Sequence, residues 1–221
     1  MSVRSRRSFV AVVSIVVLAG PGASARAATV GLWHMDESSG AMIDSSGSGN
    51  NGTLSNVTRV SPGYNGSGRA YRFNGSNSKV TVPNDASLNP GSQNITLKAY
   101  VKFPDRPSDA IGDFDLVRKQ SGGRPSYKME ILRTGKAFCR FTGTGGALSI
   151  TAGPDLSDDR WHTIVCSKTS SGIKLTVDGS SFQRSGSVGS ISDSIVLLLG
   201  AKPGGGDWYK GLMDEVSIVI G

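Results

Sequence analysis

The sequence predicts an all-β protein in which antiparallel strands form a sandwich or a barrel. Short runs rich in β-branched and aromatic residues recur along the chain, clusters of Gly, Ser, Asn, Asp and Pro separate them, and helical periodicity is almost absent. Such runs are typical of half-buried strands joined by turns. The alternation is clearest in 95–103, where Leu97, Ala99, Val101 and Phe103 share one face of the predicted strand.

The strong strand signals lie between residues 79 and 220. "TG" (134–135) and "SSG" (170–172) have the composition of hairpin turns. "DFD" (113–115) is interpreted as a solvated loop that enters a strand. No linker, repeat or second domain interrupts the series. We expect strands over 79–83, 95–103, 115–119, 127–132, 136–141, 162–168, 173–179, 194–200 and 214–220.

The first 27 residues have the pattern of an export signal. The chain begins with basic residues, continues with an apolar run over 9–20, and offers Ala25 and Ala27 as a small-residue cleavage site. The run is too short to span a bilayer. "SRRSFV" (5–10) resembles a twin-arginine signal, so the export route stays open. We expect a secreted protein whose folded domain is 28–221, with no membrane span after removal of the signal.

The net charge argues against nucleic acid as a partner. The chain carries 24 basic and 17 acidic residues, and four of the arginines belong to the predicted signal. The remaining excess of positive charge is small. No stripe of Lys and Arg with interleaved aromatic residues is present, so nucleic-acid binding is not expected.

The two cysteines and two histidines raise the question of nucleophilic catalysis. His162 and Cys166 would lie on one face of a strand, but four residues separate them by roughly 13 Å, which is beyond hydrogen-bond reach. Cysteines in exported proteins more often pair than stay free. We therefore expect a disulfide between Cys139 and Cys166, on adjacent or facing strands; two buried thiols are the alternative. His34 and His162 each follow a Trp, and we expect Trp33 and Trp161 to lie in the core.

Six segments of the chain, in this order, carry a family resemblance: "VGLWHMDESSGAMIDSSGSGNNGTL" (30–54), "YRFNGSNSKVTVP" (71–83), "ITLKAYVKF" (95–103), "LSDDRWHTIVCSK" (156–168), "IKLTVDG" (173–179) and "GLMDEVSIVI" (211–220). They resemble the laminin G-like jelly-roll domains of the concanavalin A-like lectin/glucanase superfamily, in particular its secreted bacterial members. The resemblance covers nearly all of the predicted domain. It implies a two-sheet antiparallel jelly-roll sandwich, usually a binding module, often with a structural calcium ion and with the two cysteines paired.

The superfamily also includes glucanases, so catalysis needs its own test. Glycoside hydrolysis usually requires two positioned carboxylates. The glucanases that this chain resembles carry theirs on one strand as Glu-x-Asp-x-x-Glu or a close variant. The chain has three Glu, at 37, 130 and 215, and none belongs to such a motif. We do not expect an enzyme.

A calcium site is expected where the opening segment meets the closing strand. Residues 36–51 offer Asp36, Asp44, Asn50 and Asn51 in a polar, Gly-rich loop, and oxygen ligands of this kind suit calcium. The resemblance implies that this loop lies beside the last strand, which adds Asp214. The metal ligands predicted from the sequence are Asp36, Asp44 and Asp214; the alternative is that they only cap turns.

The segment "KPGGGDWYKG" (202–211) is the best candidate for contact with a sugar. Aromatic faces and carboxylates are typical of carbohydrate sites. The predicted ligand-binding residues are Trp208, Asp207 and Tyr209, although the resemblance implies that Tyr209 packs inward and leaves Trp208 more exposed. In the alternative, Trp208 folds over the edge of the sandwich.

The expected function is that of a secreted, non-catalytic binding module that recognises carbohydrate through surface loops. One alternative is a module for adhesion to an extracellular protein. A glycoside hydrolase of the same superfamily is a further alternative. The expected partner is thus a polysaccharide or an extracellular protein.

Overall fold

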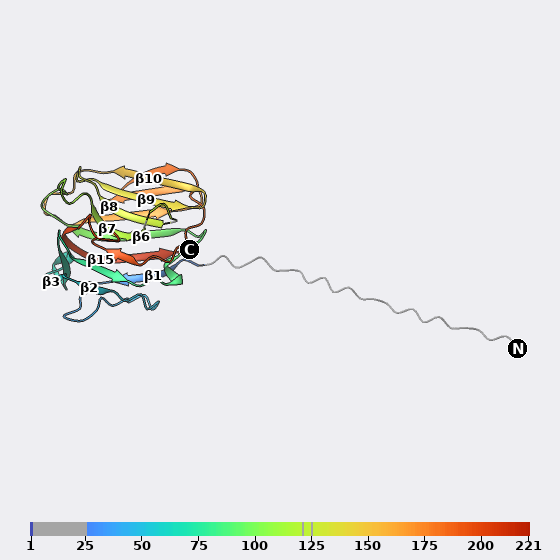
Figure 1. Ribbon diagram of the computed structural model, residues 1–221, viewed down its shortest axis with the longest axis horizontal. Helices are drawn as coiled ribbons and strands as arrows, with labels where there is room; N and C mark the ends of the chain where they lie inside the picture. Colours follow the sequence, from blue (N-terminus) through green and yellow to red (C-terminus); the bar gives the residue numbers. More distant parts are fainter. Residues whose placement is uncertain (2–25, 121, 125) are drawn as a thin grey trace.

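Two antiparallel sheets pack face to face in the protein, as a computed structural model shows for residues 1, 26–120, 122–124 and 126–221 (Figure 1). The predicted two-sheet, all-β jelly-roll sandwich is therefore confirmed. Almost all of the expected export signal, residues 1–27, lies outside the described residues. Within the described part of the chain, no helix has the length and apolar character needed to cross a membrane.

One sheet has eight strands: β13 (Ser180–Ser185), β12 (Gly172–Val177), β11 (His162–Lys168), β6 (Ile95–Lys102), β15 (Lys210–Ile220), β4 (Ala70–Asn74) and β3 (Thr58–Val60) in spatial order, with β1 (Ala28–Trp33) also beside β15. Along one edge β15 pairs with β6, and along the other it pairs first with β4 and then with β1. The first and last strands of the described domain are therefore neighbours (Figure 1).

The other sheet has seven strands: β10 (Gly146–Ala152), β9 (Ala137–Gly143), β8 (Ser126–Ile131), β7 (Phe114–Lys119), β14 (Leu197–Leu199), β5 (Lys79–Val82) and β2 (Thr53–Ser55) in spatial order. Two short 3-10 helices, η1 (Tyr64–Gly66) and η2 (Ala86–Leu88), lie in the connections. The expected hairpin turns at 134–135 and 170–172 join β8 to β9 and β11 to β12.

Alternation along the strands decides which side chains fill the core between the sheets. In β6 the residues at 95, 97, 99 and 101 are buried and those between them are partly exposed, as predicted. The strand ranges expected from the sequence did not include β1, β2, β3, β4, β10 or β13. The last two were missed because neither alternates in this way. All six residues of β13 are exposed, and no residue of β10 is fully buried. Both lie at an edge of their sheet, so each forms a strand through hydrogen bonds to one neighbouring strand and not through burial of alternate side chains.

A bulge interrupts β15 at Asp214 and Glu215. The pairing with β6 is regular up to Asp214 and resumes at Ser217. Glu215 has a φ of 48°, which is unusual for a residue with a Cβ atom. The bulge lies between Met213, the last residue paired with β4, and Val216, the first paired with β1. Because an extra residue bends a strand and redirects its side chains, two acidic residues project where the ends of β4 and β1 meet β15.

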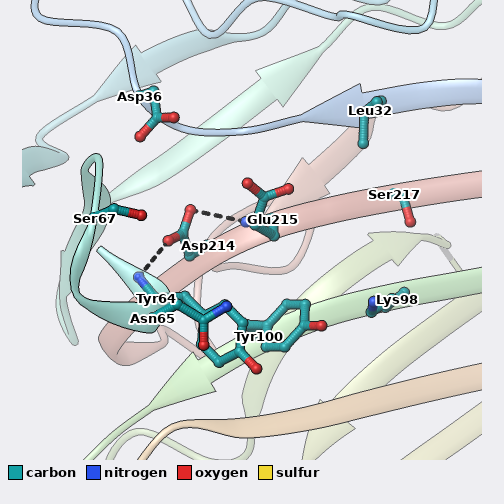
Figure 2. A pocket seen from close by; sticks show the side chains of 10 residues that line it. All are labelled: Leu32, Asp36, Tyr64, Asn65, Ser67, Lys98, Tyr100, Asp214, Glu215 and Ser217. Atoms are coloured by element: carbon teal, nitrogen blue, oxygen red, sulfur yellow. Dashed lines mark hydrogen bonds between the residues drawn. The ribbon is translucent and has the colours of Figure 1, made fainter. Parts of the chain in front are cut away.

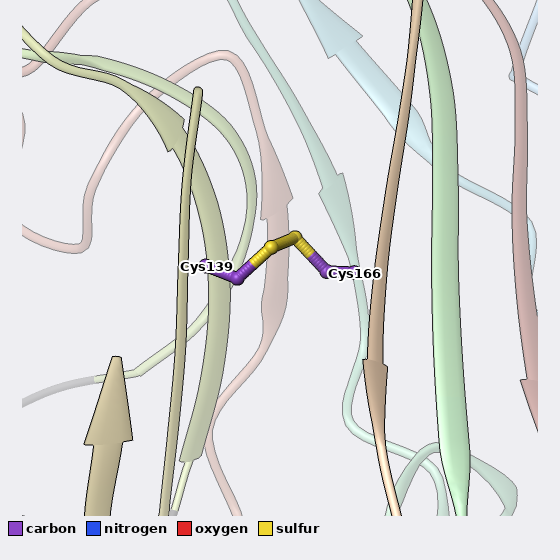
Figure 3. The surroundings of a disulfide bond; sticks show 2 residues. All are labelled: Cys139 and Cys166. Atoms are coloured by element: carbon purple, nitrogen blue, oxygen red, sulfur yellow. A yellow bond between two sulfur atoms is a disulfide. The ribbon is translucent and has the colours of Figure 1, made fainter. Parts of the chain in front are cut away.

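Cys139 on β9 and Cys166 on β11 form a disulfide (Figure 3). The predicted bridge is confirmed, and the alternative of two buried thiols is wrong. The two strands belong to different sheets and both side chains are fully buried, so the bridge joins the sheets across the core. Cys166 therefore has no free thiol with which to act as a nucleophile.

Replacing both cysteines with Ala should lower the free energy of unfolding by about 3 kcal/mol, because the bridge restricts the unfolded chain. The bridged residues are separated by 27 positions in the sequence. Equilibrium unfolding in urea measures the change, and wild-type protein under reducing conditions should approach the variant. An unchanged urea midpoint would show that core packing alone sets the stability.

Candidate functional site

A pocket of about 290 Å³ opens on the outer face of the eight-stranded sheet, beside the bulge of β15. We call it the bulge pocket. In Figure 2 the carboxylates lie on one side of it and the tyrosine rings on the other. Its walls come from strands β1, β6 and β15, from Asp36 and from the segment around η1. It is lined by Leu32, Asp36, Tyr64, Asn65, Ser67, Lys98, Tyr100, Asp214, Glu215 and Ser217.

Asp214 is the most firmly held acid of the bulge pocket. Its Oδ2 accepts a hydrogen bond from the Tyr64 backbone N–H at 2.7 Å, and its Oδ1 accepts one from the Glu215 N–H at 2.9 Å. The residue is only 3% exposed. Burial, with the negative charges of Glu215 and Asp36, raises the pKa of Asp214 to about 6 against the opposing effect of these hydrogen bonds. The pocket therefore concentrates negative charge that a cation would stabilise.

The loop from Ser61 to Arg69 approaches these acids closely because it contains glycines. Asp36 Oδ1 accepts a hydrogen bond from the Arg69 N–H at 2.6 Å. Gly68 has a φ of 63°, and a Cβ atom there would lie 2.1 Å from Asp36 Oδ1. A Cβ atom on Gly63 would lie 2.4 Å from the Arg69 carbonyl oxygen. Only glycine permits these approaches, which bring the backbone of the loop against the pocket.

The aromatic wall of the pocket consists of Tyr64 and Tyr100, whose ring centroids are 3.8 Å apart. Trp161 meets Tyr64 edge-on at 5.9 Å. The predicted core position of Trp33 is confirmed, but that of Trp161 is wrong, because this residue is partly exposed. On β11 the buried positions are 164, 166 and 168, so an odd-numbered position faces outward. The Lys98 ammonium lies 4.6 Å from the Tyr100 ring centroid, and its hydrogen bond lowers the pKa of that phenol.

The structure brings together two of the three predicted metal ligands. Asp36 and Asp214 line the bulge pocket, but Asp44 does not. The Asp44 carboxylate accepts four hydrogen bonds of 2.9–3.0 Å, from the N–H groups of Leu32, Ser46 and Asn50 and from the Ser46 hydroxyl. Burial alone would raise the pKa of Asp44, but these bonds outweigh burial and lower it. Asp44 therefore caps its own loop and has no free oxygen positioned for the pocket.

The predicted amide ligands Asn50 and Asn51 also serve the loop. The Asn50 side chain donates to the Val30 carbonyl at 2.6 Å, and Asn51 Oδ1 accepts from the Asp44 N–H at 2.8 Å. The sequence did not identify Glu215 or Ser67 as site residues, but both add oxygen atoms to the pocket that holds Asp36 and Asp214. Calcium binds oxygen donors, and carboxylates are prominent among them, so the acidic groups of the pocket fit this ion.

Each histidine is held by carboxylates. His34 Nδ1 lies 2.9 Å from Glu215 Oε2 at the rim of the bulge pocket. His162 lies between Asp158 at 2.8 Å and Asp178 at 2.7 Å. Burial alone would lower the pKa of His162, but the hydrogen bonds to the two carboxylates outweigh it and raise the pKa. His162 therefore links the segment before β11 to the turn after β12.

The segment predicted to contact a sugar divides between core and surface. Tyr209 is fully buried, lies against Phe73, Phe103 and Phe114, and bonds through its hydroxyl to the Leu212 carbonyl at 2.7 Å. It is therefore a core residue and not a ligand contact, as the inward packing implied by the resemblance already indicated. Trp208 is partly exposed.

Asp207 belongs to a network of charges on the outer side of the seven-stranded sheet. Arg118 Nη1 lies 2.8 Å from Asp115, 3.2 Å from Glu130 and 3.5 Å from Asp207, and two lysines complete the network. Asp115 is fully buried, so the interpretation of "DFD" as a solvated loop was wrong. The carboxylate atoms of the three acids lie within 4.8 Å of one another, and no other trio of potential ligands converges in this way in the described residues. Because Arg118 and the two lysines neutralise these acids, the network anchors the loop that carries Trp208.

A family model described as "Concanavalin A-like lectin/glucanases superfamily", of the laminin G type, matches residues 74–219, which is more than half of the chain. The protein belongs to this superfamily. The resemblance found in the sequence is confirmed. No curated protein sequence matches the chain.

Several solved structures of other proteins have a similar fold. The binding domain of Paraclostridial Mosquitocidal Protein 1 has a TM-score of 0.70 and 18% identity over 86% of this chain and 48% of its own. Domains LG4-5 of the mouse laminin alpha1 chain give 0.54 and 18%, covering 67% of this chain and 40% of theirs. Domain 4 of AbnA, an extracellular arabinanase from Geobacillus stearothermophilus, gives 0.61 and 16%, covering 88% and 93%. The chain thus spans about half of the mosquitocidal binding domain and nearly all of the arabinanase domain.

His162→Gln should lower the free energy of unfolding by about 1 kcal/mol at pH 5.5 and by less at pH 8.5. The pKa of His162 is raised in the folded protein, so its stabilising contribution is complete below its unfolded pKa and is lost as the pH rises through the folded value. Urea unfolding of wild type and variant at both pH values measures the difference. His34→Gln is the matched histidine control. An equal loss at both pH values would contradict the role of the charged form.

Proposed function

We propose that this protein is a secreted, non-catalytic module that binds carbohydrate in the bulge pocket. The proposal rests on one observation: two tyrosine rings lie in the same pocket as carboxylate and amide groups. A ring face can pack against the C–H groups of a sugar, while Asp36, Asp214 and Asn65 form hydrogen bonds to its hydroxyls. Both Asp214 oxygens are already fixed by backbone N–H groups, so this acid needs no reorganisation to bind.

Two further facts support the proposal. The structure of the arabinanase domain with this fold is a complex with arabinotriose, and this chain covers 93% of that domain. The disulfide is the kind of cross-link that persists outside the reducing cytosol, which favours export.

Hydrolysis has less support than binding. Asp115 and Glu130 are paired across β7 and β8, but both are buried and both bind Arg118, so a glycan has no access to them. We therefore assign this pair a structural role. Adhesion to a protein is the remaining alternative, and the absence of glycan binding in the experiment below would favour it.

We also propose that Asp36 and Asp214 hold a calcium ion in the bulge pocket, with Glu215 beside them. The three carboxylates do not converge as closely as the trio around Arg118, so the ion would draw their oxygens together. The three carboxylates come from the segment after β1 and from the bulge of β15. A bound cation would offset their repulsion and tie the first and last strands together. Its role would be structural, because it would fix the wall against which the sugar packs.

Tyr100→Ala should weaken glycan binding about tenfold, which corresponds to about 1.4 kcal/mol, because it removes a ring from the pocket wall. Calorimetric titration with arabino-oligosaccharides, and with other ligands chosen from a glycan panel, measures the affinity. Trp208→Ala is the matched control, since this partly exposed aromatic lies outside the bulge pocket.

The control variant should bind like wild type. Loss of binding in Trp208→Ala with full binding in Tyr100→Ala would move the site to the 202–209 loop. Failure of the wild type to bind any glycan would reject the carbohydrate proposal.

Calcium should raise the melting temperature by about 5–10 °C at a concentration about a hundred times its Kd, because it binds only the folded protein. Asp214→Asn should abolish this shift. Asp109→Asn, which changes an exposed acid outside the pocket, is the control and should keep it. Differential scanning calorimetry with calcium and with chelator gives the comparison. An equal shift in both variants would exclude Asp214 as a ligand.

A further inference from the structure

Strand β13 forms an open edge of the eight-stranded sheet. All six of its residues are exposed, and within the described part of the chain it pairs with β12 alone. The pairing runs from Val177 opposite Ser180 to Gly172 opposite Ser185 without a bulge. A regular edge of this length presents a row of backbone N–H and C=O groups with which another strand can pair.

The register of the β12–β13 hairpin shows which backbone groups of β13 are free. The Gly186 N–H donates to the Ser171 carbonyl at 3.0 Å, one position beyond the last pair of the ladder. In an antiparallel ladder, hydrogen-bonded pairs alternate with pairs whose N–H and C=O groups point away from each other. Ser181, Gln183 and Ser185 therefore direct these groups to the open side of the sheet. None of the three has a backbone partner there among the described residues.

The strands at the other ends of the two sheets are less open. β2 and β3 are three residues long. β10 is longer, but the Ser149 carbonyl in its middle accepts a hydrogen bond from Arg184 Nη1 at 2.9 Å. Short edge strands and basic side chains at an edge are the means by which proteins prevent the pairing of sheets. β13 contains no Lys, Pro or acid, and its one Arg is turned toward β10.

A second copy of the chain fits this edge because β13 is complementary to itself. If Gln183 of each copy faces Gln183 of the other in an antiparallel arrangement, Ser181 faces Ser185 of the second copy. All three free residues then form hydrogen-bonded pairs, each of which exchanges two backbone bonds. Any other antiparallel register leaves at least one of them without a partner on the opposite β13.

The same register also suits the side chains. Phe182 and Arg184 lie on the inner side of β13, because their partners on β12, at 175 and 173, are buried. Phe182 is nevertheless 36% exposed. In the paired edge Phe182 faces Arg184 of the second copy, so an aromatic ring meets a basic side chain and the two arginines do not face each other. Lys174, the outward cation beside Gln183, is about 14 Å from its counterpart, which is beyond the screening length at physiological salt.

We propose that the protein forms a two-fold symmetric dimer through antiparallel pairing of β13 with β13 of a second copy. The two eight-stranded sheets become one continuous sheet. Six residues of edge make a small interface, so the dimer is reversible and depends on protein concentration.

The dimer has a consequence for ligand binding, which rests on the proposed function. The two-fold axis is perpendicular to the sheet, so the outer faces of both copies are on the same side. β6, which lines the bulge pocket, is three strands from β13 in each copy, so roughly 34 Å of sheet separates the two pockets. A repeating polysaccharide can bind both pockets at once and therefore more tightly than a short oligosaccharide.

The test is analytical ultracentrifugation of the purified protein over a wide range of concentration. Gln183→Pro should weaken dimerisation at least tenfold, because Pro cannot donate at the centre of the paired edge. The Gln183 N–H points away from β12, so the variant should keep the fold of the monomer. Gln183→Thr keeps the N–H and favours a strand, so this matched control should dimerise like wild type.

Phe182→Lys is the second variant should Gln183→Pro fail to fold. It places a basic side chain opposite Arg184 of the second copy and should also weaken the dimer, since like charges opposite each other are unfavourable. A wild-type protein that is monomeric at every concentration would overturn the proposal. A dimer that persists unchanged in both variants would also overturn it.

Titration with a glycan separates the dimer from its consequence. Gln183→Pro should keep the wild-type affinity for an arabino-oligosaccharide and lose affinity for the arabinan polymer. Equal affinity of wild type and variant for the polymer would reject the bivalent binding and leave the dimer supported. A dimer that binds no glycan would reject the proposed function alone.

Discussion

The pairing of β15 with three strands is the interaction on which the rest of the molecule depends. β15 occupies the centre of the eight-stranded sheet and joins β6 on one side to β4 and β1 on the other. This arrangement closes the domain, because its first and last strands meet. It also creates the candidate site, since the change of partner coincides with the bulge at Asp214 and Glu215. A regular strand would place fewer acidic groups at this point.

The two sheets present different chemistry on their outer faces. On the seven-stranded sheet, Asp115, Glu130 and Asp207 are neutralised by Arg118 and two lysines, which yields a rigid anchor for a loop. On the eight-stranded sheet, Asp36 and Asp214 of the bulge pocket accept hydrogen bonds from backbone N–H groups and have no ion pair among the described residues. Carboxylates without a paired cation remain available to a ligand, and paired ones do not. This difference favours the eight-stranded face as the binding surface.

Local patterns predicted the fold well but located the site only in part. Alternation in 95–103 and the turn clusters gave most strands, and export with two cysteines gave the bridge between Cys139 and Cys166. Asp36 and Asp214 were found because the resemblance places the opening loop beside the last strand. Tyr64, Tyr100 and Glu215 were missed, because no local pattern marks them as site residues and only the folded sheet brings them together.

The sequence by itself determined the all-β class and the buried face of the main strands, because both follow from patterns of residues close together in the chain. It also determined the disulfide, because an exported chain with two cysteines has a single possible bridge. The tertiary structure alone decided which polar groups are free to bind. Asp44 and Asp207 look like ligands in the sequence, yet hydrogen bonds and ion pairs already occupy them. The meeting of Tyr100 and Asp214 in one pocket depends on strand register, which the pairing of β6 with β15 sets.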